Sequence, residues 1–237
     1  MNEHNQFTVD PQWKGMYRLG GISAFVLVMG YLILIALYVP VYPFPDTGQA
    51  MLEYLNGKTL VWWAIIGVSA LTDLLYALIV FSLYQALKGI NRNVMVVATG
   101  FKWLFVVLEL AISWPNYAAL ITLSDGYAAA TTDVQRAAYV ASANYSTAVL
   151  NSTVPGVYAI VFPALGTLLI GLVMRKGLFN KGTAYLGVVT GVLGIVSVVG
   201  PLLVSALEPT IILTSLLSTV WFLLVGFRLY KLDQQMK

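Results

Sequence analysis

Six apolar stretches, each long enough to cross the hydrocarbon core of a bilayer, constrain this chain more than any other feature of its sequence. Lipid offers the backbone no hydrogen-bond partners, so a chain that crosses it must be helical or part of a closed barrel. The alternation of apolar and polar residues that barrel strands require is absent. We therefore expect an all-α fold, a polytopic membrane bundle. We place its six transmembrane helices at residues 19–39, 60–86, 94–115, 154–174, 183–206 and 210–230.

The composition excludes the soluble classes of protein. Of the 237 residues, 59% are hydrophobic and 10% are charged, whereas a soluble domain carries roughly a quarter charged residues. The basic residues cluster beside the apolar stretches, so the net positive charge does not indicate nucleic-acid binding. The chain has no cysteine and a single histidine, His4. Thiolate or histidine-rich metal sites, bis-histidine haem and a serine triad are therefore excluded, and we expect no metal and no cofactor.

Basic residues are distributed unequally between the two sides of the predicted bundle. The segments on one side carry ten lysines and arginines, and those on the other carry only Lys58 and Arg136. The positive-inside rule then places both termini in the cytoplasm, which agrees with an even number of spans. We expect one integral membrane domain, with residues 1–18 and 231–237 cytoplasmic and with an exterior cap formed by residues 40–59 and 116–153.

Helix signals inside the two exterior segments predict that the cap is helical. Asp46 or Thr47 can cap a short helix that ends at Asn56-Gly57. In the longer segment, Thr131 or Thr132 can cap an Ala-rich helix over residues 133–149. A lid of one or two helices is our interpretation, and an ordered connection without a binding role is the alternative.

Aromatic, proline and glycine residues mark the boundaries and contacts of the predicted helices. Trp62, Trp63 and Trp114 fall at the outer boundary, where an aromatic belt is expected. Pro163 and Gly200-Pro201 should kink the fourth and fifth helices. Gly187 and Gly191 lie four residues apart in the fifth helix, and this spacing of small residues predicts close packing against another helix.

Three ionisable residues, Asp73, Lys102 and Glu109, lie within apolar helices. A charge at mid-bilayer costs at least about 2.5–3.5 kcal/mol, so each needs a partner or water. Asp73 on the second helix and Lys102 on the third fall at nearly the same depth, because these antiparallel helices are joined by a short turn. We therefore predict an Asp73–Lys102 ion pair. Glu109 lies two turns from Lys102 and cannot share that pair.

Polar residues at helical spacing accompany these charges. A stripe on the third helix and a matching face on the second must both point into the bundle, because lipid cannot satisfy them. Residues of the fourth and sixth helices fall at the depth of Glu109 and can bond to it. The predicted buried polar network, or ligand and ion site, comprises Asp73, Lys102, Glu109, Thr99, Ser69, Tyr76, Ser113, Tyr158 and Ser215.

This network has a structural and a functional interpretation. A buried ion pair can fix the register of helices without any chemistry, and an intramembrane charge can also mark a pathway for a ligand, ion or proton. Glu109 is the stronger functional candidate, because its neutralising partner is not evident from the sequence. We predict no catalytic residue.

Several stretches, taken in order, resemble one known family. They are Thr72-Asp73-Leu-Leu-Tyr76 with the turn Lys88-Gly-Ile-Asn91, then Phe101-Lys102-Trp103, then residues 166–179 and Gly187-Val-Val-Thr-Gly191. From Tyr17 to Tyr230 the chain resembles the uncharacterised prokaryotic six-helix membrane family catalogued as domain of unknown function 4386. The resemblance implies a six-helix fold in a prokaryotic plasma membrane and no established activity. Lys102 replaces an arginine that is frequent in this family, which keeps the charge but loses the bidentate geometry.

Three functions remain open on these observations. The leading hypothesis is a non-enzymatic accessory subunit or a binder of lipid or another hydrophobic small molecule. The first alternative is a small transporter or proton-coupled carrier that uses Asp73, Lys102 and Glu109. The second is a lipid-modifying enzyme with Glu109 as general base. The expected partners are membrane lipids, with further membrane subunits or a homo-oligomer as possibilities and no nucleic acid.

Overall fold

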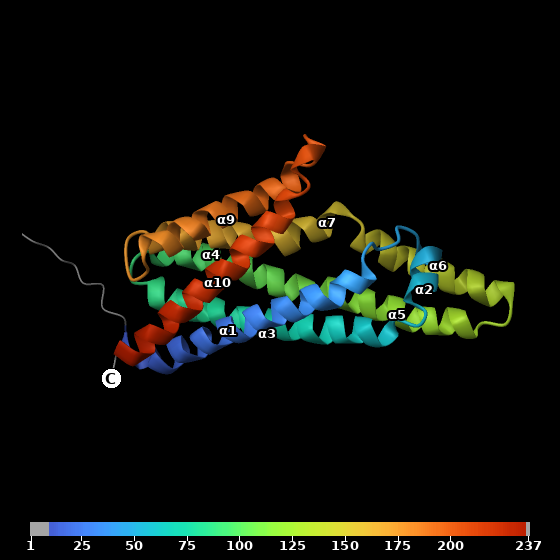
Figure 1. Cartoon of the computed structure of the whole chain (residues 1–237), viewed down its shortest axis with the longest axis horizontal. Coiled ribbons are helices and arrows are strands. Elements are labelled where there is room, and N and C mark those ends of the chain that lie inside the picture. Colours follow the sequence, from blue (N-terminus) through green and yellow to red (C-terminus); the bar gives the residue numbers. More distant parts are fainter. Residues whose placement is uncertain (1–9, 236–237) are drawn as a thin grey trace, which may run out of the picture.

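The computed structural model describes residues 10–235, and its regular structure within that range is entirely helical. Residues 1–9 of the predicted cytoplasmic segment 1–18, including His4, lie outside the described residues. Six helices of the described part are long and apolar enough to cross a membrane, as the sequence predicts. Figure 1 shows the long helices running side by side along the length of the molecule. The six span Pro11–Val41, Thr59–Leu87, Arg92–Ala129, Asp133–Met174, Lys181–Val199 and Ser205–Gln235.

The six long helices are mainly α-helical, and the third and fourth of them each contain one π-helical turn. The first, second, fifth and sixth long helices contain α1 (Lys14–Tyr38), α3 (Thr59–Leu87), α9 (Lys181–Val199) and α10 (Thr210–Gln235). The third joins α4 (Arg92–Leu108), the π-helical η3 (Glu109–Ser113) and α5 (Trp114–Ala129). The fourth contains α6 (Asp133–Leu150), α7 (Thr153–Gly156), the π-helical η4 (Val157–Val161) and α8 (Phe162–Met174).

A small helical cap covers one end of the bundle, and we call this end the cap side. It contains α2 (Gly48–Leu55), which packs on α5 and α6. Thr47 caps α2, and Thr132 forms a capping box with Gln135 at the start of α6, so both predicted helices exist where their capping residues indicated. The Ser124 hydroxyl also donates to the Leu52 carbonyl oxygen at 2.6 Å. The start of α1 and the end of α10 lie at the opposite end of the molecule (Figure 1).

The third and fifth long helices end at other residues than predicted. The third continues to Ala129, although residues 116–129 were expected to belong to the exterior cap and not to the third long helix. Polar residues lower the hydropathy of that stretch, but α5 is helical because it packs against α2 and α6. The fifth ends at Val199 instead of continuing to residue 206 with a kink, because Pro201 cannot supply the backbone N–H that a further turn needs.

Trp62 does not belong to an aromatic belt. Its side chain is completely buried, and its ring stacks on that of Tyr117 at a centroid distance of 5.2 Å. It is part of a cap-side apolar core that also includes Leu52, Ile65 and Leu120. The cap is therefore joined to the transmembrane helices by its own buried cluster.

Glycine allows α8 and α9 to approach closely along their length. A Cβ atom at Gly191 would lie 2.6 Å from the Leu168 backbone nitrogen, and one at Gly187 would lie 3.3 Å from the Gly171 Cα. Both positions therefore need glycine for this backbone contact. On the far side of the bundle, Gly21 of α1 lies equally close to the backbone of α10 at Gly226.

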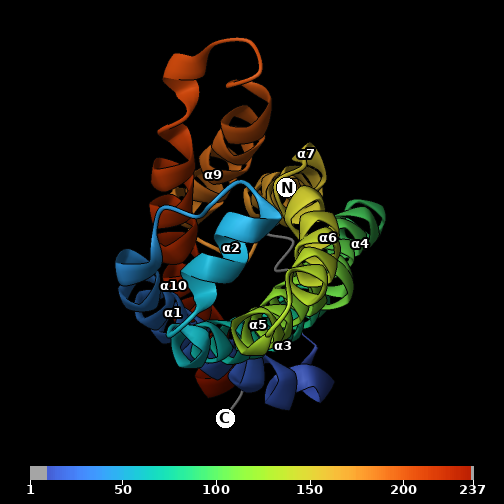
Figure 2. The same ribbon diagram turned by 90° about the vertical axis from the view of Figure 1, so that its right-hand side faces the viewer.

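The cap-side half of α10 stands apart from the cap. Figure 2, viewed from the cap side, shows α9 and the start of α10 on one side, α5 and α6 on the other, and α2 between the two groups. α10 contacts α1 and α9, whereas α5 packs on α2, α3 and α6. This divergence places a cavity between α1, α8 and α10, and the buried polar residues lie close to it.

Candidate functional site: a cavity beside the buried lysine

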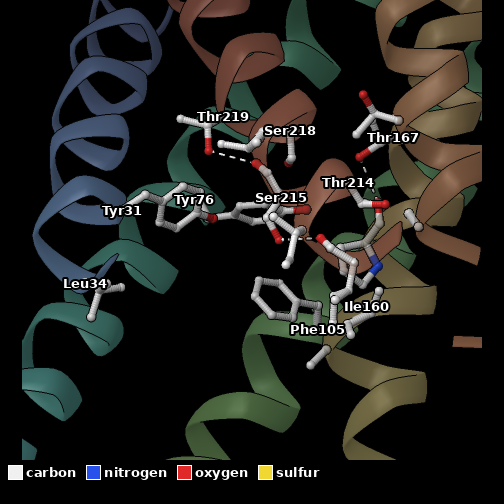
Figure 3. Close-up of a pocket in the computed structure, with 18 of the residues that line it drawn as sticks. Tyr31, Leu34, Tyr76, Phe105, Ile160, Thr167, Thr214, Ser215, Ser218 and Thr219 are labelled. Carbon is white, nitrogen blue, oxygen red and sulfur yellow. Dashed lines mark hydrogen bonds between the residues drawn. The ribbon is translucent and has the colours of Figure 1, made fainter. Parts of the chain in front are cut away.

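A cavity of about 640 Å³ opens between the cap-side halves of the long helices. Figure 3 shows Tyr31 and Leu34 of α1 on one side, Thr167 and Ile160 on the other, and hydroxyl residues of α10 between them. Carbon atoms make up most of its wall, and none of its lining residues is charged. The mouth includes Ile212 and Leu216 of α10, which are 65% and 55% exposed.

Four hydroxyl residues of α10 line the cavity, Thr214, Ser215, Ser218 and Thr219, and the protons of all but Ser218 are already used within the helix. Thr214 donates to the Thr210 carbonyl oxygen at 2.8 Å, Ser215 donates to the Ile211 carbonyl oxygen at 2.9 Å, and Thr219 donates to the Ser215 carbonyl oxygen at 2.9 Å. Such back-bonding is the usual state of serine and threonine in a transmembrane helix. These groups can therefore accept hydrogen bonds from a ligand more readily than they can donate them.

Lys102 is buried directly behind the cavity wall. Its side chain is 1% exposed, and its ammonium donates to the Tyr76 hydroxyl at 2.6 Å and to the Thr167 hydroxyl at 2.7 Å. Both acceptors line the cavity. The ammonium also lies 5.4 Å from the ring centroid of Trp221 and 5.7 Å from that of Phe222. Two hydroxyl groups thus separate a buried positive charge from the interior of the cavity.

The predicted Asp73–Lys102 ion pair is wrong. No carboxylate of the described residues lies within ion-pair distance of the lysine, which has only the hydroxyl and ring contacts just given. Lys102 instead faces α8, where Gly166 leaves room for its stem: a Cβ atom at Gly166 would lie 2.6 Å from the Lys102 Cγ. Equal depth along the two helices was not sufficient to predict an ion pair, because the two side chains have different partners: Lys102 bonds to Tyr76 and Thr167, and Asp73 bonds to Trp114.

Asp73 has its own partner on the third long helix. Its Oδ2 accepts a hydrogen bond from the Trp114 indole nitrogen at 2.7 Å, and its side chain is 6% exposed. Trp114 was expected in the aromatic belt, but its indole N–H donates a hydrogen bond to this buried carboxyl group. The Asp73 and Glu109 carboxyl groups lie close enough to interact electrostatically.

Glu109 begins the first of two π-helical segments, which are joined by a hydrogen bond. The Ser113 hydroxyl of η3 and the Tyr158 hydroxyl of η4 lie 2.8 Å apart, and Glu109 and Ser113 are the two ends of η3. A proline follows each segment, Pro115 after η3 and Pro163 after η4. Proline removes one backbone donor and widens the helix before it. Both irregular turns therefore lie at the depth where the polar side chains converge.

The structure divides the predicted network into two clusters. Lys102 and Tyr76 form one with Thr167, beside the cavity. Asp73, Glu109, Ser113 and Tyr158 form the other, around η3 and η4. The remaining three predicted residues make no side-chain hydrogen bond to either cluster. The Ser69 carbonyl oxygen accepts from Thr72, the buried Thr99 hydroxyl has no partner, and Ser215 lines the cavity.

Sequence reasoning missed three polar residues of this region: Trp114, Thr167 and Thr190. The Thr190 side chain on α9 is 3% exposed, its hydroxyl has no hydrogen-bond partner, and it lines the cavity. Threonine is ordinary in a membrane helix, so neither threonine stands out in the sequence. The one available signal was that Thr167 and Thr190 lie within two of the stretches that carry the family resemblance, residues 166–179 and 187–191.

No cluster of three metal-ligating side chains occurs between residues 10 and 235. The comparisons with known proteins gave one match. The sequence pattern of the family described as domain of unknown function 4386 matches residues 19–230. No curated protein and no solved structure matches the chain.

Proposed function

We propose that this chain, which belongs to the family described as domain of unknown function 4386, binds a lipid or another hydrophobic small molecule in the cavity between α1, α8 and α10. We place it in the plasma membrane of a prokaryote. The observation that carries the proposal is the cavity itself, about 640 Å³ in volume and lined mostly by carbon. Ligand pockets in proteins have volumes of roughly 300–1,000 Å³ and combine apolar walls with a few polar groups.

The position of the mouth supports a ligand that arrives from the bilayer. Ile212 and Leu216 line the cavity and are also exposed on the outside of α10. In a membrane this surface faces lipid, so an apolar chain can pass beside α10 without crossing water. The hydroxyl groups of Tyr76 and Thr167 bond to the buried Lys102, and Thr190 also lines the cavity, so the apolar wall carries a few polar groups.

A bulky substitution tests the proposal. We expect Ser215→Trp, which projects an indole into the cavity, to lower the amount of lipid that remains bound after purification in a mild detergent. Leu213→Trp is the matched control, because Leu213 lies on the same helix, is 47% exposed and does not line the cavity. Native mass spectrometry and lipid extraction measure the bound lipid. Equal retention by both variants would contradict the proposal, and wild-type protein that retains no amphiphile would favour a role as an accessory subunit.

The acidic cluster favours one second candidate, a proton-coupled carrier. Asp73 and Glu109 are buried carboxyl groups without a basic partner among the described residues, and they lie beside two irregular helical turns. Glu109→Gln should then abolish proton flux into vesicles that contain the purified protein. Glu109 does not line the cavity, so no contact in the structure supports its use as a general base on a bound lipid.

A further inference from the structure

We propose that the ligand of this cavity is an anionic amphiphile, whose oxyanion accepts hydrogen bonds from Tyr76 and Thr190 while Lys102 compensates its charge from behind the wall. This inference rests on the proposed function and specifies the chemical class of the ligand. The oxyanion is a carboxylate or a phosphate, and its apolar chain lies along the carbon-lined wall toward α10.

The first argument is the unbalanced charge of Lys102. Its surroundings come from three elements, and all are neutral: Tyr76 of α3, Thr167 of α8, and the rings of Trp221 and Phe222 on α10. Hydroxyl dipoles and aromatic faces only partly replace the hydration of an ammonium group, and a buried charge ordinarily requires a counter-ion. Asp73 and Glu109 do not serve, because neither lies within ion-pair distance of the lysine. An anionic ligand in the adjacent cavity would supply the missing charge.

The second argument is the direction of the hydrogen bonds. A lysine ammonium can only donate, so the Tyr76 oxygen must accept from it and the phenolic proton is left to donate elsewhere. No other partner of the Tyr76 hydroxyl exists in the described part of the chain. A hydroxyl group that accepts from a cation becomes a stronger donor. Thr167, by contrast, already donates to the Pro163 carbonyl oxygen at 2.8 Å. Tyr76 is therefore the group that transmits the lysine charge to the cavity.

The third argument is independent of Lys102. Thr190 lines the cavity from α9, is 3% exposed and has a buried hydroxyl without any partner. Most threonines of this cavity bond to their own helix, so the exception calls for an explanation. An unpaired buried hydroxyl costs about 1–3 kcal/mol. A ligand oxygen that reaches this hydroxyl would satisfy it, and we assign it to the same oxyanion because Tyr76 and Thr190 line one cavity.

These donors select among amphiphiles. A carboxylate or phosphate accepts from both hydroxyls and neutralises Lys102. A long-chain alcohol accepts hydrogen bonds but leaves the lysine charge uncompensated, and an alkylamine is repelled by it. The walls do not discriminate between apolar chains, so charge on the head group is the expected basis of selectivity.

Binding of defined amphiphiles tests this inference. We use purified protein in nanodiscs of zwitterionic phosphatidylcholine, with oleate, oleyl alcohol and dodecylamine as radiolabelled probes and phosphatidylglycerol as the phospholipid arm. Oleate or phosphatidylglycerol should bind at least tenfold more tightly than oleyl alcohol, and dodecylamine should bind least. Preference for oleate alone identifies a free fatty acid as the source of the oxyanion, and preference for phosphatidylglycerol alone identifies a phospholipid.

Conservative variants test which residues produce the preference for an anionic amphiphile. Thr190→Val removes no hydrogen bond of the protein, so it should fold and lower the affinity for the anion about tenfold, the effect of one hydrogen bond to a charged group. Tyr76→Phe should lower it by at least as much, and both variants should lose less affinity for oleyl alcohol than for the anion, because a hydrogen bond to a neutral oxygen is weaker than one to an oxyanion. Thr214→Val is the matched control: it makes the same change on α10, and selectivity should not alter.

Two results would overturn the inference and are distinguishable. Equal affinity of the wild type for oleate and oleyl alcohol, or an equal loss of both probes in Thr190→Val, refutes the anionic ligand and leaves lipid binding intact. Failure of every probe to bind, with Ser215→Trp and Leu213→Trp also indistinguishable from the wild type, refutes the proposed function itself.

Discussion

Replacing Lys102 with methionine tests whether this side chain serves the fold or the ligand. Methionine keeps the unbranched stem that passes Gly166 and removes only the ammonium group. Afterwards Thr167 still donates to the Pro163 carbonyl oxygen, and Tyr76 keeps its proton for a ligand. The variant therefore strands no buried charge.

The expected change in the free energy of unfolding follows from two opposing contributions. The ammonium donates two hydrogen bonds, at 2.6 and 2.7 Å, and a hydrogen bond to a charged group contributes about 1.5–3 kcal/mol. Against this, desolvation of an ammonium costs several kcal/mol, and replacing a buried charge network by apolar groups is often neutral or stabilising by about 1–4 kcal/mol. We expect Lys102→Met to be as stable as the wild type or more stable in lipid-free protein. Removing one partner of a true buried ion pair would instead destabilise it by about 3–5 kcal/mol.

Double-mutant cycles make this test sharper. Lys102 contacts Tyr76 directly, so Lys102→Met and Tyr76→Phe should couple by about 1.5–3 kcal/mol. Lys102→Met and Asp73→Asn share no contact and should be additive within about 0.5 kcal/mol. The assay is unfolding of the purified protein in mixed micelles by increasing SDS, followed by circular dichroism. A coupling above 1.5 kcal/mol between Lys102 and Asp73 would refute the separation of the two clusters.

Three further predictions concern the bundle and its orientation. Trp114→Phe should lower the free energy of unfolding by about 1.5–3 kcal/mol, because it removes the donor to the buried Asp73, whereas Trp63→Phe, at an exposed position, should change it by less than about 0.5 kcal/mol. Gly191→Ala should lower the melting temperature, because its methyl group would lie 2.6 Å from α8, and Gly67→Ala should preserve or raise it, because nothing lies within 4 Å. Ser142→Cys introduces the chain's sole thiol and should react with an impermeant reagent on intact cells; reaction only after lysis would contradict an exterior cap.

The transmembrane helices could be predicted because their determinant is local. Apolar runs of sufficient length specify spanning helices without knowledge of their neighbours, and threonine before a helical stretch specifies a cap, as Thr47 and Thr132 show. The residues at which the helices end were harder to predict. The third helix was predicted to end at residue 115, yet the segment after it packs against α2 and α6 and is helical to Ala129.

The partners of the buried charges could not be predicted, because a side chain's contacts depend both on its depth in the membrane and on the rotation of its helix. The sequence gives the height of Asp73 and Lys102 along their helices, but the rotation of each helix depends on how all six pack. Gly166 admits Lys102 toward α8, and Trp114, directly after the π-helical η3, bonds to Asp73. The cavity has the same origin, since it arises where α10 diverges from the cap and no single segment encodes it.

An experimental density map of the protein, purified from its native membrane in a neutral detergent, tests the central claim most directly. The account predicts elongated density in the cavity, with its head within hydrogen-bond distance of the Tyr76 and Thr190 hydroxyls and its tail directed toward Ile212 and Leu216. Side chains that fill this volume, or a chain-like ligand whose polar head lies at the mouth away from Lys102, would contradict it.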